Sequence, residues 1–234
     1  MTTDNTFHGF SHRTVQFLKD LKKHNDREWF NDHKEAYTTQ VMDPARALVT
    51  DLGDRLKAIA PAIIAVPKFN RSIFRIYRDT RFSSDKSPYK THLGLFLWEG
   101  VRARMECSGF YFHLEPPHLM LGVGLYMFPR KALEHFRNAA VHPEHGAELT
   151  DIIRQMGELE GYTLGGKHYK RLPPGFDATH PNGELLLHNG LYAGTEGPIP
   201  EELYSEQLID YCMERFTPLT DLHRWLVDLN TRIF

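Results

Sequence analysis

The chain has 234 residues and 41% of them are hydrophobic, which is enough for a real core in one large domain or two small ones. Its 28 basic and 30 acidic residues give a formal net charge of -2. This balance excludes a global positive field that would draw the whole surface to nucleic acid or to an anionic membrane. We therefore expect any attraction to anions to be local.

The amino terminus and the cysteines indicate the compartment. The opening MTTDNTFHGF lacks the basic and apolar regions of a secretion signal, and no apolar segment approaches the roughly 20 residues that span a bilayer. Cys107 and Cys212 have no metal-ligand or redox-motif spacing, so we expect two buried, reduced thiols. These features predict a cytoplasmic protein without a membrane partner.

The first 60 residues are expected to form three helices. Ser11 is placed to cap the first helix, either Asn25 or Asp26 the second, and Pro44 is placed to open the third. The first helix has an apolar stripe made of Val15, Phe17, Leu18 and Leu21. The segment APAIIAVP then ends the helical pattern.

From about Asn70 to Met127 the apolar period changes to two, which predicts strands over SIFRIYR, GFYFHLEP and HLMLGVGLYMF. The turn EPPH would join the last two as an antiparallel hairpin. The expected core side chains are Phe74, Ile76, Phe110, Phe112, Leu114, Leu119, Leu121, Val123, Leu125 and Met127. The opposite, polar face would carry Arg75, Tyr77, Tyr111, His113, Glu115, Met120, Gly122, Gly124 and Tyr126.

Gly122 and Gly124 weaken a strand interior, and two glycines on one face indicate that something approaches the backbone closely. A ligand would explain them. A packed helix or a strongly curved sheet would explain them equally well.

The last part of the chain returns to helices. We expect two short helices over PRKALEHFRNAAV and PEHGAELTDIIRQM, then an irregular segment with one hairpin and a second basic cluster of Lys167, Lys170 and Arg171. Two amphipathic helices should end the chain, anchored by Leu203, Leu208, Phe216, Leu222, Trp225 and Leu226. The predicted fold is a single α+β domain over residues 1–234, with helices from both termini packed on the apolar face of a curved, mostly antiparallel sheet.

The segment FRIYRDTRFSSDKSPYK, residues 74–90, concentrates positive charge. It contains five basic and two acidic residues, and Arg71 just upstream brings the basic residues to six. The five are Arg75, Arg78, Arg81, Lys86 and Lys90. Converging guanidinium groups suit a phosphate or carboxylate, so we expect an anion site here. The alternative is structural pairing of the local arginines with Asp79 and Asp85.

His113 and Glu115 are the candidate acid/base pair, because a carboxylate two positions away on the same strand face can orient or charge an imidazole. His92 or His118 could join them to bind a metal through nitrogen and oxygen. The chain has 14 histidines but no HExxH motif, so the preferred interpretation is a hydrogen-bonded pair, with no metal site and with any cofactor left unknown.

The leading functional hypothesis is a site for a small phosphorylated or carboxylated ligand on the polar sheet face, with catalysis left open. Arg75, Arg78 and Arg81 would clamp the anion, Lys86 and Lys90 would add charge, and Tyr111, Gly122 and Gly124 would line the site. The alternative is a module that binds nucleic acid or an acidic protein without catalysis, because aromatic residues alternate with the cations of the basic segment. The small ligand is favoured since the rest of the chain has no extended basic track.

The motifs RDTRFSSDKSPYK, GFYFHLEPP, LGVGLYMF and KRLPPGFDATHP, with FLKDLKKHNDREWFNDHKEAY near the amino terminus, resemble a bacterial and fungal family known as domain of unknown function 2461. The resemblance covers nearly the whole chain. It implies a single family domain, and it brings no activity, cofactor or catalytic residue with it.

Overall fold

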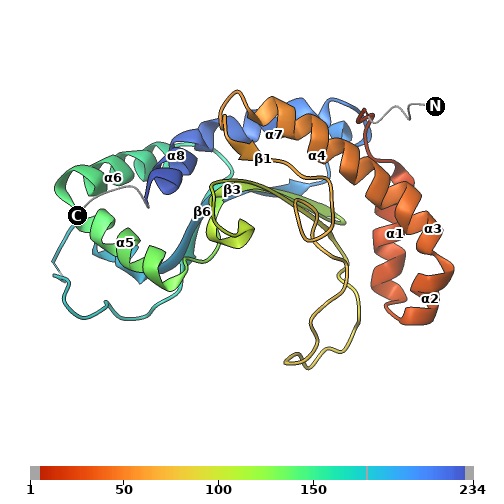
Figure 1. Cartoon of the computed structure of the whole chain (residues 1–234), viewed down its shortest axis with the longest axis horizontal. Coiled ribbons are helices and arrows are strands. Elements are labelled where there is room, and N and C mark those ends of the chain that lie inside the picture. Colours follow the sequence, from red (N-terminus) through yellow and green to blue (C-terminus); the bar gives the residue numbers. More distant parts are fainter. Residues whose placement is uncertain (1–5, 178, 230–234) are drawn as a thin grey trace. The chain divides into compact units, whose positions relative to one another are not determined.

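The computed structural model describes residues 6–177 and 179–229. It confirms an α+β fold, with helices and an open antiparallel sheet of six strands in the order β1-β2-β3-β4-β6-β5 (Figure 1). The strands are β1 (Ile63–Ile64), β2 (Leu93–Glu99), β3 (Gly109–Glu115), β4 (His118–Leu125), β5 (Tyr162–Lys167) and β6 (His188–Pro198). Among the described residues, no helix has the length and apolarity needed to cross a membrane.

Residue contacts divide the chain into two compact units. The first comprises Met1–Leu97, Tyr111–Leu121 and Glu196–Glu214, and the second comprises Trp98–Phe110, Gly122–Thr195 and Arg215–Phe234. Strands β2, β3, β4 and β6 each contribute residues to both units. A single domain over residues 1–234 stays a prediction.

Three helices of the first unit begin where the sequence predicts. Ser11 caps α1 in a reciprocal capping box with Thr14, Asp26 caps α2 through the backbone N–H of Trp29, and Pro44 lies in the first turn of α4. A π-helical turn, η1 (Tyr37–Met42), leads into α4 and was not predicted. The helices are α1 (His12–Lys23), α2 (Arg27–Asp32), α3 (Lys34–Ala36), α4 (Asp43–Leu56) and most of α7 (Leu208–Phe216).

The second unit contains α5 (Arg130–Val141), α6 (Pro143–Gly157) and α8 (Thr220–Asp228), all at predicted positions. Helix α6 packs against both α5 and α8. The six anchors predicted for the carboxyl-terminal helices are all buried, and so are Cys107 and Cys212, as expected.

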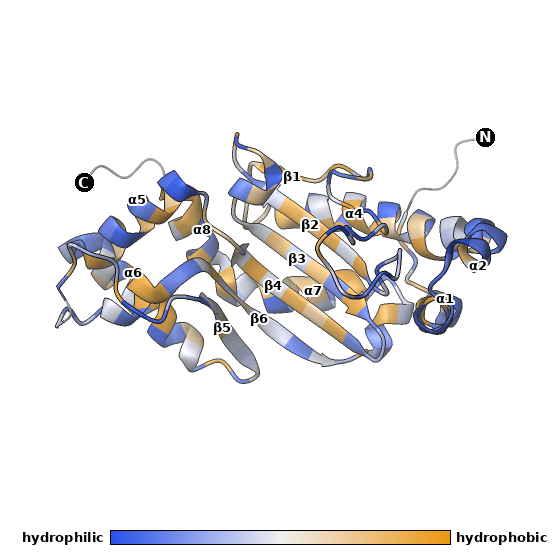
Figure 2. Ribbon diagram, turned by 90° about the horizontal axis from the view of Figure 1, so that it is seen from below, coloured by the Kyte–Doolittle hydropathy of each residue, from blue (hydrophilic) through white to orange (hydrophobic). Residues whose placement is uncertain are grey.

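The hairpin of β3 and β4 confirms the predicted alternation over most of its length (Figure 2). Phe110, Phe112 and Leu114 are at most 1% exposed, whereas Tyr111 and Glu115 are partly exposed. Segments from both ends of the chain cover the apolar face: Phe10, just before α1, stacks on Phe112 in the first unit, and Phe216 packs edge-on against Phe110 in the second.

Several details of the strand prediction were wrong. The segment SIFRIYR forms only isolated bridges, of Ile73 with Leu95 and of Tyr77 with Tyr89, so Phe74 and Ile76 do not share a strand face. The strand lies later, at β2, which alternation could not reveal because six of its seven residues are buried. Met127 is 55% exposed because β4 ends at Leu125. The glycine-rich strand β6 was also missed.

Candidate functional site

The polar side chains of β3 lie on the face of the sheet opposite the buried phenylalanines. In the first unit, Figure 1 shows α4 and α7 on one side of the sheet and the loop formed by residues 74–90, drawn in yellow, on the other. Tyr111, His113 and Glu115 therefore project to the side of the basic loop. His92, the residue before β2, joins them there.

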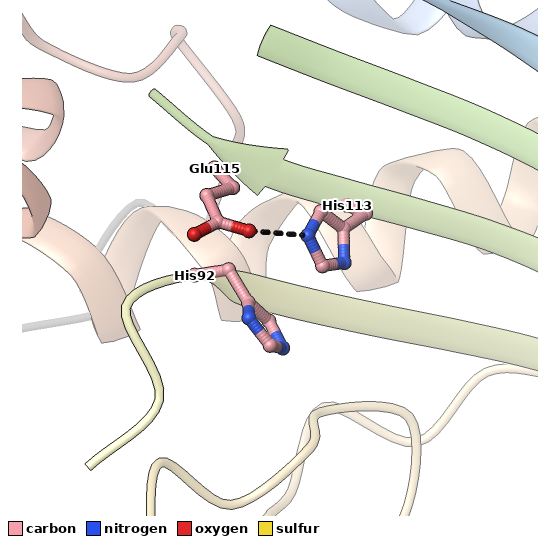
Figure 3. A group of neighbouring side chains, drawn as sticks. All are labelled: His92, His113 and Glu115. Atoms are coloured by element: carbon pink, nitrogen blue, oxygen red, sulfur yellow. Dashed lines mark hydrogen bonds and ion pairs between the residues drawn. The ribbon is translucent and has the colours of Figure 1, made fainter. Parts of the chain in front are cut away.

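His92, His113 and Glu115 form a compact cluster (Figure 3). One ligand-type atom from each residue lies within 4.8 Å of the other two. Nε2 of His113 is 3.5 Å from Oε2 of Glu115, and the imidazole rings of His92 and His113 have centroids 4.2 Å apart. The structure thus brings together the two predicted acid/base residues and one of the two histidines considered as their neighbours. His118 is exposed and is not a member of the cluster.

Neighbouring side chains hold the outer atoms of this cluster. The Tyr111 hydroxyl is 2.7 Å from Nδ1 of His113, and the Thr91 hydroxyl donates to Oε1 of Glu115 at 2.9 Å. Lys22, from the last turn of α1, lies 3.5 Å from the same carboxylate oxygen. These contacts fix the orientation of both the imidazole and the carboxylate. Thr91 and Lys22 were missed at the sequence level, because their proximity depends on tertiary packing.

Burial keeps the two imidazoles neutral at physiological pH. It lowers the pKa of His92 to about 4, with a further contribution from the nearby His113. It also lowers the pKa of His113, although Glu115 partly opposes the effect. Burial raises the pKa of Glu115, but the hydrogen bond from Thr91 and the nearby His113, His92 and Lys22 together outweigh it, so the net shift is downward. The cluster therefore presents two neutral bases and one carboxylate.

The corner between α1 and α2 positions the segment that carries His92. The side-chain amide of Asn25 donates to the backbone oxygen of Tyr89 at 2.9 Å and accepts from its backbone N–H at 3.0 Å. The buried Tyr89 ring also stacks on Phe30, with centroids 4.2 Å apart. Lys90 follows, with its ammonium 5.3 Å from the centre of the Phe74 ring.

The basic segment pairs most of its own charges. Arg78 contacts Asp85, and the Asp79 carboxylate accepts hydrogen bonds from Nε and Nη2 of Arg81 at 2.9 and 2.7 Å. These bonds hold the pKa of Asp79 below its usual range, and hydrogen bonds from Ser87 and Arg78 do the same for Asp85. Lys86 donates to the backbone oxygen of Thr80 at 2.9 Å. Arg75 is exposed. Arg78 and Arg81 therefore form the pairs with local aspartates that the sequence analysis gave as the alternative to an anion site.

Gly122 and Gly124 belong to the second unit, whereas His92, His113 and Glu115 belong to the first, and a place for the two glycines in the ligand site stays a prediction. Gly124 has a φ of +138°, and a Cβ there would come within 2.4 Å of the Leu191 oxygen. A Cβ at Gly122 would meet only the Ala193 oxygen, at 3.5 Å. Strand β6 therefore accounts for the close approach that the glycine at 124 indicates.

The second basic cluster also belongs to the second unit. Its first member, Lys167, forms an ion pair of 2.7 Å with Glu184. Lys170 and Arg171 are exposed in the segment that follows β5.

A groove of about 460 Å³ lies elsewhere in the first unit, between α1, α2 and η1. Trp29 lines it, stacked on His33 with ring centroids 4.1 Å apart, and Arg13 and Asp20 add opposite charges. None of its lining residues was predicted as a site residue or belongs to the histidine cluster. The cluster has the stronger chemistry, because it combines two neutral bases, a carboxylate and a hydroxyl on strand β3 and at the start of β2.

Comparison with known proteins identifies one family. The sequence model of the family described as Conserved hypothetical protein (DUF2461) matches residues 13–225, which is most of the chain and agrees with the resemblance carried by the motifs. No curated protein matches the chain.

Proposed function

This chain belongs to the DUF2461 family of conserved hypothetical proteins, and we propose that it binds a small phosphorylated or carboxylated ligand. The ligand would lie on the polar sheet face beside His92, His113 and Glu115. The observation that carries this proposal is the grouping of two closely packed imidazoles and the Tyr111 hydroxyl on that face, with Lys90 on the adjoining segment. We place this activity in the cytoplasm.

Lys90 supports the proposal because its charge acts on the cluster. Lys90 is two residues before His92, and its ammonium lies 5.3 Å from the centre of the Phe74 ring, which packs edge-on against Tyr111 with ring centroids 6.0 Å apart. An anion bound there would be attracted to Lys90 and could accept hydrogen bonds from the Tyr111 hydroxyl or an imidazole N–H. Arg75, which is exposed on the same loop, can add a guanidinium.

The paired arginines can still take part. Arg81 and Asp79 are both well exposed, and an exposed ion pair is worth only about 0–1 kcal/mol. A multiply charged oxyanion can therefore replace Asp79 or Asp85 as the partner of Arg81 or Arg78 at small cost. Lys86 would have to give up its hydrogen bond to the backbone oxygen of Thr80 before it could contact the anion.

The cluster also has the parts for acid/base chemistry. A neutral His113 can accept a proton from a bound ligand, and Glu115 can stabilise the imidazolium that results. Catalysis is proposed only for a ligand that binds at this site, so binding has to be measured first.

The experiment is calorimetric titration and thermal shift of the purified protein with phosphorylated and carboxylated metabolites, in the presence of EDTA. A ligand at 100 times its dissociation constant should stabilise the protein by roughly 2.7 kcal/mol. We expect Arg75→Ala and Lys90→Met each to weaken binding about tenfold or more, since each removes a charge-assisted contact. Lys19→Met, on the exposed face of α1, is the charge-matched control and should leave the affinity unchanged. If both site variants bind with wild-type affinity, Arg75 and Lys90 do not bind the anion and the proposal is wrong about them.

The exposed aromatic side chains of the loop favour a second candidate, the binding of nucleic acid or an acidic protein. Phe82 is 96% exposed beside Arg81, and Tyr77 is 55% exposed. If no metabolite binds but single-stranded nucleic acid does, with an affinity that falls with salt and is lost in Phe82→Ala, this second function replaces the first.

A further inference from the structure

We propose that His92, His113 and Glu115 are the protein ligands of a divalent transition-metal ion such as Zn²⁺. The inference rests on the proposed function only for its location on the same sheet face. Two imidazoles and one carboxylate are a ligand set used by zinc sites that keep a coordination position open, and by other first-row metals.

The spacing of the ligand atoms fits a shared ion better than it fits a hydrogen bond. Nε2 of His113 and Oε2 of Glu115 are 3.5 Å apart, which is beyond the usual 2.7–3.2 Å range of an N–H···O bond. Two ligands of one tetrahedral zinc ion, with bonds of about 2.0–2.1 Å, lie about 3.4 Å apart. A ring nitrogen of His92 lies within 4.8 Å of one ligand-type atom of each of the other two residues, so a small rotation of its side chain can complete the set.

The outer contacts leave the correct atoms available. The Tyr111 hydroxyl engages Nδ1 of His113, so Nε2 is the nitrogen that faces the cluster. Thr91 and Lys22 engage Oε1 of Glu115, so Oε2 faces the cluster as well. Partners of this kind on the remote atoms of imidazole and carboxylate ligands orient them toward a metal.

Strand β3 borders the proposed metal site on one side, and the basic segment that ends at Lys90 borders it on the other. His113 and Glu115 are two residues apart on β3, and their side chains are 19% and 37% exposed, so an ion can reach them from solvent. Lys90 opposes a bare cation at this place, but it would attract an anion that fills the open coordination position. The structure thus assigns to the metal the role of a second anchor for the proposed anionic ligand.

The test uses tag-free, EDTA-treated full-length protein, titrated with Zn²⁺ alone by calorimetry. We expect one tight equivalent per chain. His92→Asn and Glu115→Gln should each weaken that equivalent by tenfold or more. Tyr111→Phe should weaken it by about 10–100-fold through the orientation of His113. His118→Asn, which changes an exposed histidine of the same unit outside the cluster, should bind as the wild type does.

The results separate this inference from adventitious binding and from the proposed function. A chain with 14 histidines is expected to bind Zn²⁺ weakly at its surface, but His118→Asn would weaken such binding as much as the cluster variants do. The inference is overturned if the wild type takes up no tight equivalent, or if the cluster variants bind as well as the wild type while circular dichroism shows them folded. If His92→Asn does not fold, Glu115→Gln decides by itself. Binding of metabolites in EDTA tests the anion site without the metal.

Discussion

At the scale of single residues, one side-chain amide connects the amino-terminal helices to the candidate site. Asn25 makes two hydrogen bonds to the backbone of Tyr89, and Lys90, Thr91 and His92 follow directly. The sequence indicates Asn25 only as a possible helix cap, a role that Asp26 takes. Its actual partner is 64 residues away, so the contact depends on the fold.

We expect Asn25→Ala to lower the free energy of unfolding by about 1–3 kcal/mol, because it leaves a partly buried N–H and C=O of Tyr89 without their partner. It should also weaken ligand or metal binding at His92. Urea denaturation measures the stability, and Asn31→Ala, on the exposed surface of α2, is the control with an expected change within about 0.5 kcal/mol. Equal stability of the two variants would show that the amide does not anchor Tyr89.

At the scale of elements, β4 shows how a neighbouring strand explains a sequence feature that a ligand would also explain. Gly124 adopts a left-handed φ, and its Cα faces the backbone of Leu191 and Tyr192 in β6. Gly122, two positions earlier, has ordinary space around it. Of the two glycines, only Gly124 is therefore demanded by the contact with β6.

We expect Gly124→Ala to destabilise the protein by more than about 2 kcal/mol, since it adds both backbone strain and a clash with backbone atoms. The matched substitution Gly122→Ala should change the unfolding free energy by less than about 1 kcal/mol. Thermal or urea unfolding of both variants measures the difference. Similar losses at the two positions would mean that sheet pairing is not the reason for the glycine at 124.

At the scale of the whole molecule, both units contain histidines that burial holds neutral. Burial lowers the pKa of His92 and His113 in the first unit and of His188 and His223 in the second. His223 is 1% exposed, and its two ring nitrogens lie 2.9 Å from the Ser108 hydroxyl and from Oε2 of Glu99. Protonation of such groups opposes the folded state.

Stability should therefore fall as the pH drops below about 6.5, the pKa of a histidine in an unfolded chain. In that range the unfolded chain binds protons that the folded histidines still exclude, and for His92 the window extends down to about pH 4. We expect a loss of roughly 1–2 kcal/mol or more between pH 7 and pH 5, measured by urea unfolding at a series of pH values. A free energy of unfolding that stays constant or rises over this range would contradict the burial of neutral histidines.

The sequence by itself determined the local features of this protein. Helix starts followed from capping residues such as Ser11 and Asp26, and the two faces of β3 followed from strict alternation, which placed His113 and Glu115 side by side. The family followed from motifs along the whole chain. Each of these depends on neighbours within a few residues, which is the range that periodicity and capping report.

Only the tertiary structure decided which distant residues meet. Strand β2 is buried on both faces and shows no alternation, so the placement of His92 beside His113 could not be read from the pattern. The ion pairs of Arg78 and Arg81, the Asn25 contact and the approach of β6 to Gly124 likewise depend on loop conformation and strand pairing. Packing brings these groups together, since burial and close contact between distant segments do not exist until the chain is folded.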